Sequence, residues 1–131
     1  MDTQITRNTL CKEERLKSKA ITDKLFSGAS KSFVIYPLRM VYMPVDKTDG
    51  FASILVSVSK KRFKRAVKRN RVKRQIREVY RTNKHALLQT LAGKDYQLAV
   101  AFIYLDKVLH PTAELETTMK KLLARLTEKL V

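Results

Sequence analysis

The basic segment at residues 60–81 constrains this chain more than any other feature. It contains one acid, Glu78, and its net charge of +11 accounts for most of the whole chain's +16. Its twelve basic residues are Lys60, Lys61, Arg62, Lys64, Arg65, Lys68, Arg69, Arg71, Lys73, Arg74, Arg77 and Arg81. Like charges at this density repel one another, and binding to a dense polyanion relieves the repulsion. Nucleic acid is the usual polyanion, so the segment indicates a nucleic-acid partner.

The same segment has the periodicity of an amphipathic helix. Its apolar side chains recur at helical spacing: Val72, Ile76, Val79 and Tyr80. The residues opposite this stripe are Asn70, Arg74, Arg77 and Arg81, with Arg71 and Lys73 on either side. We therefore expect a helix that runs to about residue 90, with its apolar stripe on a sheet and a guanidinium-rich ridge facing outward.

Length and composition exclude several classes of protein. The 131 residues suffice for one domain, and 44% hydrophobic residues exclude a disordered basic tail. Cys11 is the single cysteine, which excludes an internal disulfide and a zinc site built on paired cysteines. No apolar run is long enough to span a bilayer, and residues 1–16 lack the apolar core of a signal peptide. We expect a cytoplasmic, single-domain protein over residues 1–131, with residues 1–10 as a flexible arm.

The first half of the chain predicts a short helix followed by strands. Residues 18–27 suit a helix with Ser18 as the N-cap and Gly28 as the stop. Residues 32–44 and 51–58 are rich in β-branched and aromatic side chains, which favours strands. Pro37 should divide the first run, because proline cannot donate to a ladder. Residues 44–50 carry turn residues and predict a hairpin between the strands.

The second half predicts a central strand and a last helix. Residues 96–105 form a continuous apolar run, typical of a strand covered on both faces. A helix should begin at Thr112, and its apolar residues at helical spacing are Leu115, Met119, Leu122, Leu123, Leu126 and Leu130. The expected order is α-β-β-β-α-β-α in a single two-layer α+β domain.

The basic helix leaves several functional readings open. It could be a solvated charged face, a localisation signal, or a surface for the phosphate backbone of a nucleic acid. A solvated charged face is disfavoured because the segment lacks carboxylates to balance its cations. A localisation signal is disfavoured because the segment has a clear amphipathic period. A DNA-binding helix is disfavoured because the apolar stripe suits packing on a sheet rather than a dimerising zipper. A ribosomal or RNA-chaperone protein stays open as an alternative.

Catalysis by the polypeptide finds no support in the sequence. Neither His85 nor His110 has a carboxylate or cysteine at a spacing typical of catalytic pairs, so we expect exposed or capping roles. The aspartates are scattered without metal-ligand spacing, and three glycines exclude a glycine-rich phosphate loop. We expect no catalytic and no metal-ligating residues.

Two stretches of the sequence resemble the protein subunit of bacterial ribonuclease P. Residues 58–61 read VSKK and residues 66–81 read AVKRNRVKRQIREVYR, which matches that family's Arg-Asn-Arg signature followed by Lys-Arg and Arg-Glu. Arg15-Leu16, followed by a helix that ends in Leu25-Phe26 and Gly28, is similar to the family's opening. Two departures are Ile21, where relatives often have phenylalanine, and the bulky, basic residues 62–65.

The resemblance implies a mixed sheet with a left-handed β-α-β crossover. It implies a protein that assists removal of the 5′ leader from precursor tRNA, while the catalytic RNA subunit cuts with Mg²⁺ bound mainly by RNA. The residues implied in docking to that RNA are Lys60, Lys61, Arg65, Lys68, Arg69, Asn70, Arg71, Lys73, Arg74 and Arg77. A cleft between the first helix and the sheet would hold the leader, with stacking from Phe26, Tyr36 and Tyr42. DNA and membranes are not expected partners.

Overall fold

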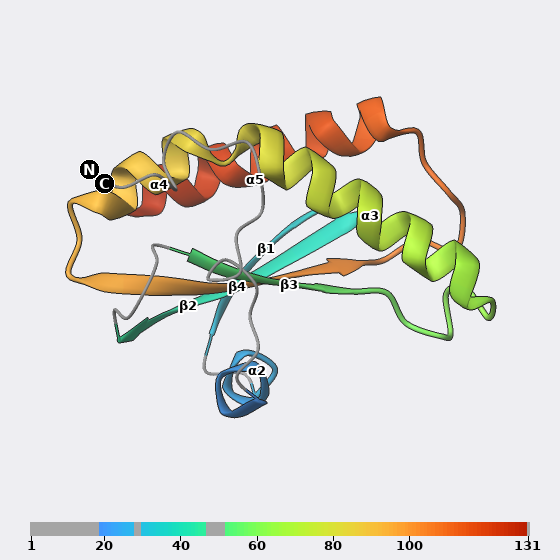
Figure 1. The fold of residues 1–131 in the computed structure, drawn as a ribbon, viewed down its shortest axis with the longest axis horizontal. Helices are drawn as coiled ribbons and strands as arrows, with labels where there is room; N and C mark the ends of the chain where they lie inside the picture. Colours follow the sequence, from blue (N-terminus) through green and yellow to red (C-terminus); the bar gives the residue numbers. More distant parts are fainter. Residues whose placement is uncertain (1–18, 28–29, 47–51, 131) are drawn as a thin grey trace.

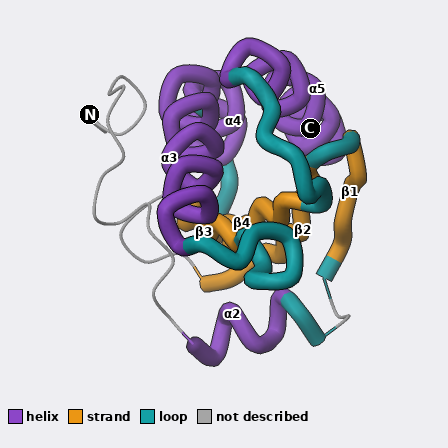
Figure 2. The backbone as a smooth tube through the Cα atoms, turned by 90° about the vertical axis from the view of Figure 1, so that its right-hand side faces the viewer, coloured by secondary structure: helices purple, strands orange, loops and turns teal. Residues whose placement is uncertain are grey.

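The computed structural model describes residues 19–27, 30–46 and 52–130. Its elements are α2 (Lys19–Leu25), β1 (Lys31–Ile35), β2 (Leu38–Asp46), β3 (Ala52–Ser57), α3 (Ala66–Asn83), α4 (His85–Ala92), β4 (Tyr96–Tyr104) and α5 (Thr112–Leu130). The helices α3, α4 and α5 cover one face of the sheet, and α2 lies across the other (Figures 1 and 2). The expected arm at residues 1–10, Ser18 and Gly28 lie outside the described residues.

The four strands lie in the order β1-β2-β4-β3. β2 is antiparallel to both β1 and β4, whereas β3 is parallel to β4. The prediction of a hairpin between the second and third strands is therefore wrong, because β4 lies between them. The reason is burial: β4 is apolar on both faces and nearly fully buried, so it takes the place with a neighbour on each edge.

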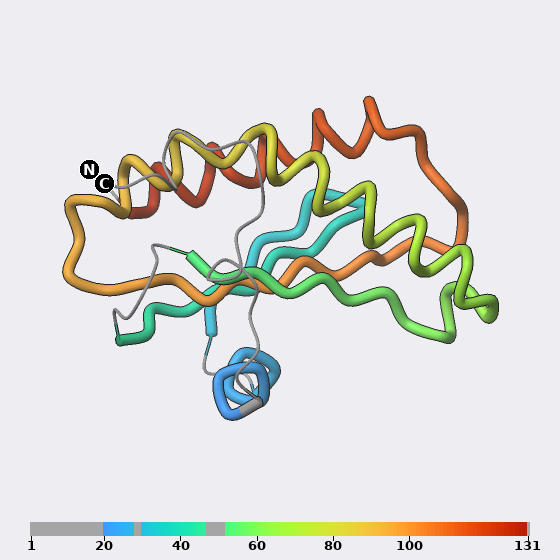
Figure 3. The backbone as a smooth tube through the Cα atoms, viewed as in Figure 1, coloured from blue at the N-terminus to red at the C-terminus, as the bar shows by residue number. Residues whose placement is uncertain are grey.

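The crossover from β3 to β4 is left-handed. Figure 3 lets the chain be followed from β3 through α3 and α4 into β4. The strand arrows in Figure 1 run to the right, so β3 and β4 point toward the viewer in Figure 2, which shows that side. There the helices lie above the two strands, and β4 lies to the right of β3. Most parallel crossovers have the opposite hand. The prediction drawn from the family resemblance is confirmed.

Prolines shape the first two strands in different ways. The peptide bond between Tyr36 and Pro37 is cis, and it separates β1 from β2 as expected. Pro44, by contrast, does not open a turn but lies within β2, which continues to Asp46. The pairing of β1 with β2 already ends at Tyr42, so β1 does not extend alongside Pro44.

The basic helix is shorter than expected. It ends at Asn83, and after Lys84 a second helix, α4, continues to Ala92. The Asn83 side chain donates to the carbonyl of Val79 at 2.7 Å, which competes with the backbone ladder at this point. The last helix begins at Thr112, as predicted.

The sheet has a different core on each face. The larger core lies between the sheet and α3, α4 and α5, and it includes the apolar stripe of α3, which is fully buried as predicted. The smaller core lies on the α2 side around Leu25, Val41, Ala99 and Ala101. Full burial of one such large side chain stabilises the fold by about 1.5–3 kcal/mol. The position of α3 on the sheet is therefore determined by its apolar stripe, and the ridge faces away from the sheet.

Candidate nucleic-acid interface

Most of the residues expected to dock on RNA are exposed. They lie on α3 and on the loop at residues 58–65, and we call this surface the basic ridge. The exposed members are Lys60, Lys61, Arg65, Lys68, Asn70, Arg71, Arg74 and Arg77. Arg69 and Lys73 are half-buried. The structure thus brings the ten predicted residues together on one helix and the loop that precedes it.

Arg69 organises the loop before α3. Its Nη1 donates to the carbonyl of Phe63 at 2.9 Å and to the carbonyl of Lys64 at 2.7 Å. A guanidinium that binds two consecutive carbonyls restrains the loop backbone. Arg69 therefore positions the loop, a role that the sequence did not suggest.

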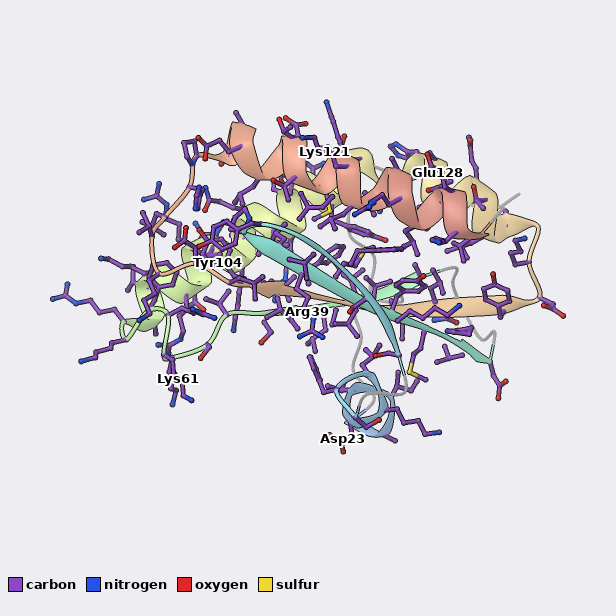
Figure 4. The ribbon with its side chains drawn as sticks, turned by 180° about the vertical axis from the view of Figure 1, so that it is seen from behind. Asp23, Arg39, Lys61, Tyr104, Lys121 and Glu128 are labelled. Atoms are coloured by element: carbon purple, nitrogen blue, oxygen red, sulfur yellow. The ribbon has the colours of Figure 1, made fainter. Side chains whose placement is uncertain are left out.

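The loop at residues 58–65 is also anchored to the core of the domain. Phe63 is buried, and its ring lies 5.9 Å from that of Tyr104. The amide of Lys61 donates to Ser59 Oγ at 3.0 Å, and the amide of Arg62 donates to the carbonyl of Ser59. Lys61 lies at one end of the molecule and projects away from the sheet (Figure 4). The bulky sequence of this loop thus holds Lys60 and Lys61 on a defined turn.

The N-terminus of α3 is electropositive. Arg65 occupies the N-cap position and makes no side-chain capping bond, and the first turn contains no acid. The first amide groups of a helix lack intrahelical partners, and the helix dipole adds positive potential there. Basic residues at this end are unfavourable, because they add to the positive potential of the dipole. An anion such as phosphate offsets this potential and accepts hydrogen bonds from the unpartnered amide groups.

The acid of α3 is engaged at the far end of the ridge. Glu78 forms a bidentate ion pair with Arg81. The hydrogen bond from Arg81 lowers the pKa of Glu78, and the same bond raises the pKa of Arg81. Within the described ranges, no ion pair joins a cation of residues 60–77 to a carboxylate. The positive charge of the ridge is therefore left for an external partner.

The three candidate aromatic residues lie in different places. Phe26, at the C-terminal end of α2, is 48% exposed, and Tyr36, at the β1–β2 turn, is 61% exposed. Tyr42 is buried on the opposite face of the sheet, where it stacks on Phe33 with 5.6 Å between ring centroids. The structure therefore does not bring Tyr42 to the α2 side.

Sequence reasoning missed two residues on the α2 side. Val34 and Arg39 are directly opposite each other in the β1–β2 register, and both are exposed. Figure 4 shows Arg39 on the same side of the sheet as α2. Strand alternation would have placed both on one face, but only the structure shows which face α2 leaves uncovered.

His110 has two carboxylate partners, so the expectation that it has none is wrong. Its Nε2 lies 2.6 Å from Asp106 Oδ2, and its Nδ1 lies 2.9 Å from Glu114 Oε2. Hydrogen bonds to Asp106 and then Glu114 raise the pKa of His110, and the bond from His110 lowers the pKa of Asp106. The spacings of four residues on either side are a signal that the sequence contained.

The cluster around His110 is joined to the basic helix. Gln75 Nε2 donates to the carbonyl of His110 at 3.1 Å and to Thr112 Oγ1 at 3.0 Å. The Tyr104 hydroxyl donates to the carbonyl of Val108 at 2.6 Å. Burial raises the pKa of Tyr104 to about 12, so this phenol stays protonated at neutral pH. These bonds hold the β4–α5 connection against α3.

Among the residues that the structure describes, no group of three or more His, Cys, Asp or Glu is placed to hold a metal ion. None of the helices there is long and apolar enough to cross a membrane.

Comparison with known proteins identifies the family. The sequence profile of the family Ribonuclease P matches residues 10–127. A ribonuclease P protein component from Porphyromonas gingivalis is 44% identical over 118 residues, which cover 89% of this chain and 85% of that protein. The fold is similar to that of the Staphylococcus aureus RNase P protein, with a TM-score of 0.68, 23% identity, and coverage of 86% and 94% of the two chains. The Thermotoga maritima RNase P protein gives a TM-score of 0.59 at 22% identity, with coverage of 88% and 96%. The chain therefore belongs to the ribonuclease P protein family.

Proposed function

We propose that this ribonuclease P protein component binds the catalytic RNA subunit through the basic ridge. The observation that carries the proposal is the outward ridge on α3, whose cations have no described carboxylate partner from residue 60 to residue 77. Arginine forks bind phosphate oxygens in a bidentate manner, and Asn70 among them can donate to a base edge or a 2′-hydroxyl. The loop held by Arg69 and Phe63 adds Lys60 and Lys61 at a defined position.

We propose that the α2 side of the sheet binds the single-stranded 5′ leader of precursor tRNA. Phe26, Val34 and Tyr36 are exposed apolar side chains there or at its edge, and Arg39 adds a cation. Single strands bind where aromatic faces lie beside positive charge. Tyr42 is not included, because it is buried on the face that packs against the longer helices.

In this proposal the polypeptide positions the RNA chains and contributes no reacting group. We propose that Mg²⁺ is held mainly by the RNA subunit and its substrate. When bound there, Mg²⁺ would activate the attacking water and stabilise the leaving oxygen. The chain would raise the local affinity for the leader and screen the repulsion between RNA phosphates. We also propose a cytoplasmic location, which a role in tRNA processing supports.

Reconstitution tests the proposal. The full chain is combined with a bacterial ribonuclease P RNA at low Mg²⁺, and cleavage of a precursor tRNA is measured. We expect cleavage at the mature 5′ end to be stimulated over that by RNA alone. Binding to structured RNA without any stimulation would instead favour a ribosomal or RNA-chaperone role.

The leader contact has its own test. Phe26→Ala should weaken binding of precursor tRNA to the holoenzyme by about 1–3 kcal/mol if one base stacks on this ring. Binding of mature tRNA, which lacks a leader, should not change. An equal loss for both ligands would show that Phe26 supports the fold rather than the leader.

A further inference from the structure

A cavity away from the basic ridge lies near the C-terminal end of α2, because Ser30 lines it and donates to the carbonyl of Leu25 at 2.6 Å. It has a volume of about 780 Å³ and lies between the start of β1, the adjoining parts of β2 and β4, and the C-terminal end of α5. It is lined by Ser30, Lys31, Ser32, Phe33, Tyr42, Met43, Pro44, Tyr96, Leu98, Lys129 and Leu130. We call it the α5 pocket. Figure 4 shows Glu128, next to Lys129, near one end of the molecule and Lys61 near the other.

Aromatic rings form much of the pocket wall. Phe33 and Tyr42 stack with 5.6 Å between centroids and an interplanar angle of 26°. Tyr96 lies on β4, which is paired with the β2 strand that carries Tyr42. Tyr96 is half-buried, so part of its surface faces the cavity rather than the core. A flat apolar ring entering the pocket would therefore meet aromatic surface.

Cations surround the same cavity. Lys31 and Lys129 line it, and the Arg125 guanidinium lies 5.6 Å from the centroid of the Phe33 ring. Lys121, Arg125 and Lys129 follow one another at four-residue spacing, so they form a row along α5 that leads to the pocket. Glu128 is exposed but does not line the cavity. Within the described parts of the chain, none of these cations is ion-paired, and no acid lines the pocket.

This combination selects for a particular kind of ligand. An aromatic wall accepts the face of a nucleobase, and a row of cations accepts the phosphates on either side of it. The volume lies in the range of sites that enclose one small organic group. A base-paired helix cannot insert a base into such a cavity, because its bases are stacked inside the duplex.

We propose that the α5 pocket binds one unstacked nucleotide of a single-stranded RNA segment, with the adjoining phosphates on Lys121, Arg125 and Lys129. The choice of RNA as ligand rests on the proposed function, but the site is distinct from the basic ridge, and its aromatic wall belongs to the core on the α5 face of the sheet. Such a contact would let the protein hold a single-stranded region of RNA at the end of the domain opposite the loop of residues 58–65.

Photocrosslinking to the intact chain tests this proposal. The probe is a single-stranded RNA of roughly ten nucleotides that carries 4-thiouridine, a length within the usual range for such sites. Mass spectrometry then locates the crosslinked peptides. We expect crosslinks to the peptides that contain Phe33 or Tyr96, in addition to any in residues 60–81. Lys129→Glu should reduce the pocket crosslinks about tenfold, as expected for a lost phosphate contact, and leave those in residues 60–81 unchanged.

Matched variants separate binding from packing. Lys120→Glu makes the same charge change on α5 but outside the pocket, so the pocket crosslinks should persist. Tyr96→Phe keeps the ring and should keep the crosslinks, whereas Tyr96→Leu removes the stacking surface and should lose them. Equal effects of the two lysine variants, or retention of the crosslinks in Tyr96→Leu, would overturn the proposal.

Other outcomes are equally decisive. Crosslinks confined to residues 60–81 and the α2 side would show that the pocket does not bind RNA. Covalent protein dimers in place of RNA adducts would assign the pocket to contact between two copies. If precursor cleavage is not stimulated but pocket crosslinks form, the proposed ribonuclease P function fails while the RNA site stands.

Discussion

The two long helices on the same face of the sheet, α3 and α5, differ in charge although their lengths are nearly equal. Over 18 residues α3 has seven basic residues and one acid, whereas over 19 residues α5 has four basic residues and three acids. Both bury an apolar stripe against the same core. The apolar stripe determines where each helix packs, so the charge on the outer face can differ between the two helices.

The helix starts show the same contrast. α5 has Glu114 in its first turn, bonded to His110 just before the helix, which suits the helix dipole. α3 has Arg65 at its N-cap and no acid in the first turn. The difference teaches that α5 is arranged for its own stability, while α3 carries a charge pattern that is unfavourable by itself and that a bound polyanion would relieve.

The largest expected effect is on stability and comes from the buried apolar stripe that α3 and α5 both have. Ile76→Ala in α3 and Leu122→Ala in α5 each remove a fully buried side chain. Each should lower the free energy of unfolding by about 2–5 kcal/mol, because a cavity is left in the core. Urea denaturation measures this, with Arg74→Ala and Lys121→Ala as exposed controls that should change little. A much smaller loss for one helix would show that the two stripes are not equivalent.

The second-largest effect is on RNA affinity and should distinguish the exposed face of α3 from that of α5. Arg71→Ala combined with Arg74→Ala removes two exposed ridge cations. We expect affinity for ribonuclease P RNA to fall on the order of 100-fold and the slope of log affinity against log salt to decrease by about 2. Fluorescence anisotropy over a salt series gives both quantities. Lys120→Ala on α5 is the control, and an unchanged slope in the double variant would remove these arginines from the interface.

A substitution at the start of α3 should change stability and binding in opposite directions. The backbone of Arg65 is extended, as an N-cap residue requires, so serine there can accept a bond from the first turn. Arg65→Ser should raise the free energy of unfolding by about 0.5–1 kcal/mol and weaken RNA binding a few-fold. Lys64→Ser removes the same charge without forming a cap, so it should weaken binding with no gain in stability. A gain in both variants would point to relief of charge repulsion instead.

The smallest effect should come from the cluster at the start of α5. The pKa of His110 is raised by its carboxylate partners, so its contribution to stability is fully present below the unfolded value of 6.5. That contribution is lost as pH rises through the raised folded value. Asp106, whose pKa is lowered, stays ionised over this range and adds no slope.

Thermal unfolding between about pH 6 and pH 9 covers the range in which histidine loses its proton. The midpoint of the natural chain should fall as pH rises, and His110→Gln should reduce this slope. His85→Gln is the matched control, because His85 lies in α4 rather than in the β4–α5 connection that carries His110. Identical slopes in the natural chain and His110→Gln would exclude His110 as the group that titrates.

Local patterns in the sequence predicted the helices and strands well. The stripe Val72–Tyr80 predicted the buried face of α3, and the apolar run at residues 96–105 predicted the central strand. The start of the last helix at Thr112 was also predicted. These features depend on neighbours within a few residues, and a periodic pattern records such neighbours directly.

Contacts between distant segments were not predictable in the same way. The place of β4 between β2 and β3, the burial of Tyr42 away from α2, and the bonds from Arg69 to the loop all depend on packing that no local pattern records. The sequence did not predict that the helix breaks at Lys84. The side-chain hydrogen bond from Asn83 that accompanies this break leaves no trace in a periodic pattern.

By itself, then, the sequence determined that this protein has a helix with one apolar face and a concentrated positive charge, which favours a polyanionic partner. Charge and periodicity are properties of the chain alone, so they hold before any folding is considered. Only the tertiary structure decided which cations remain exposed, which one positions the loop, and where aromatic rings and lysines meet in the α5 pocket. Those facts arise when β1, β2, β4 and α5 pack together, and close packing joins residues that are far apart in sequence.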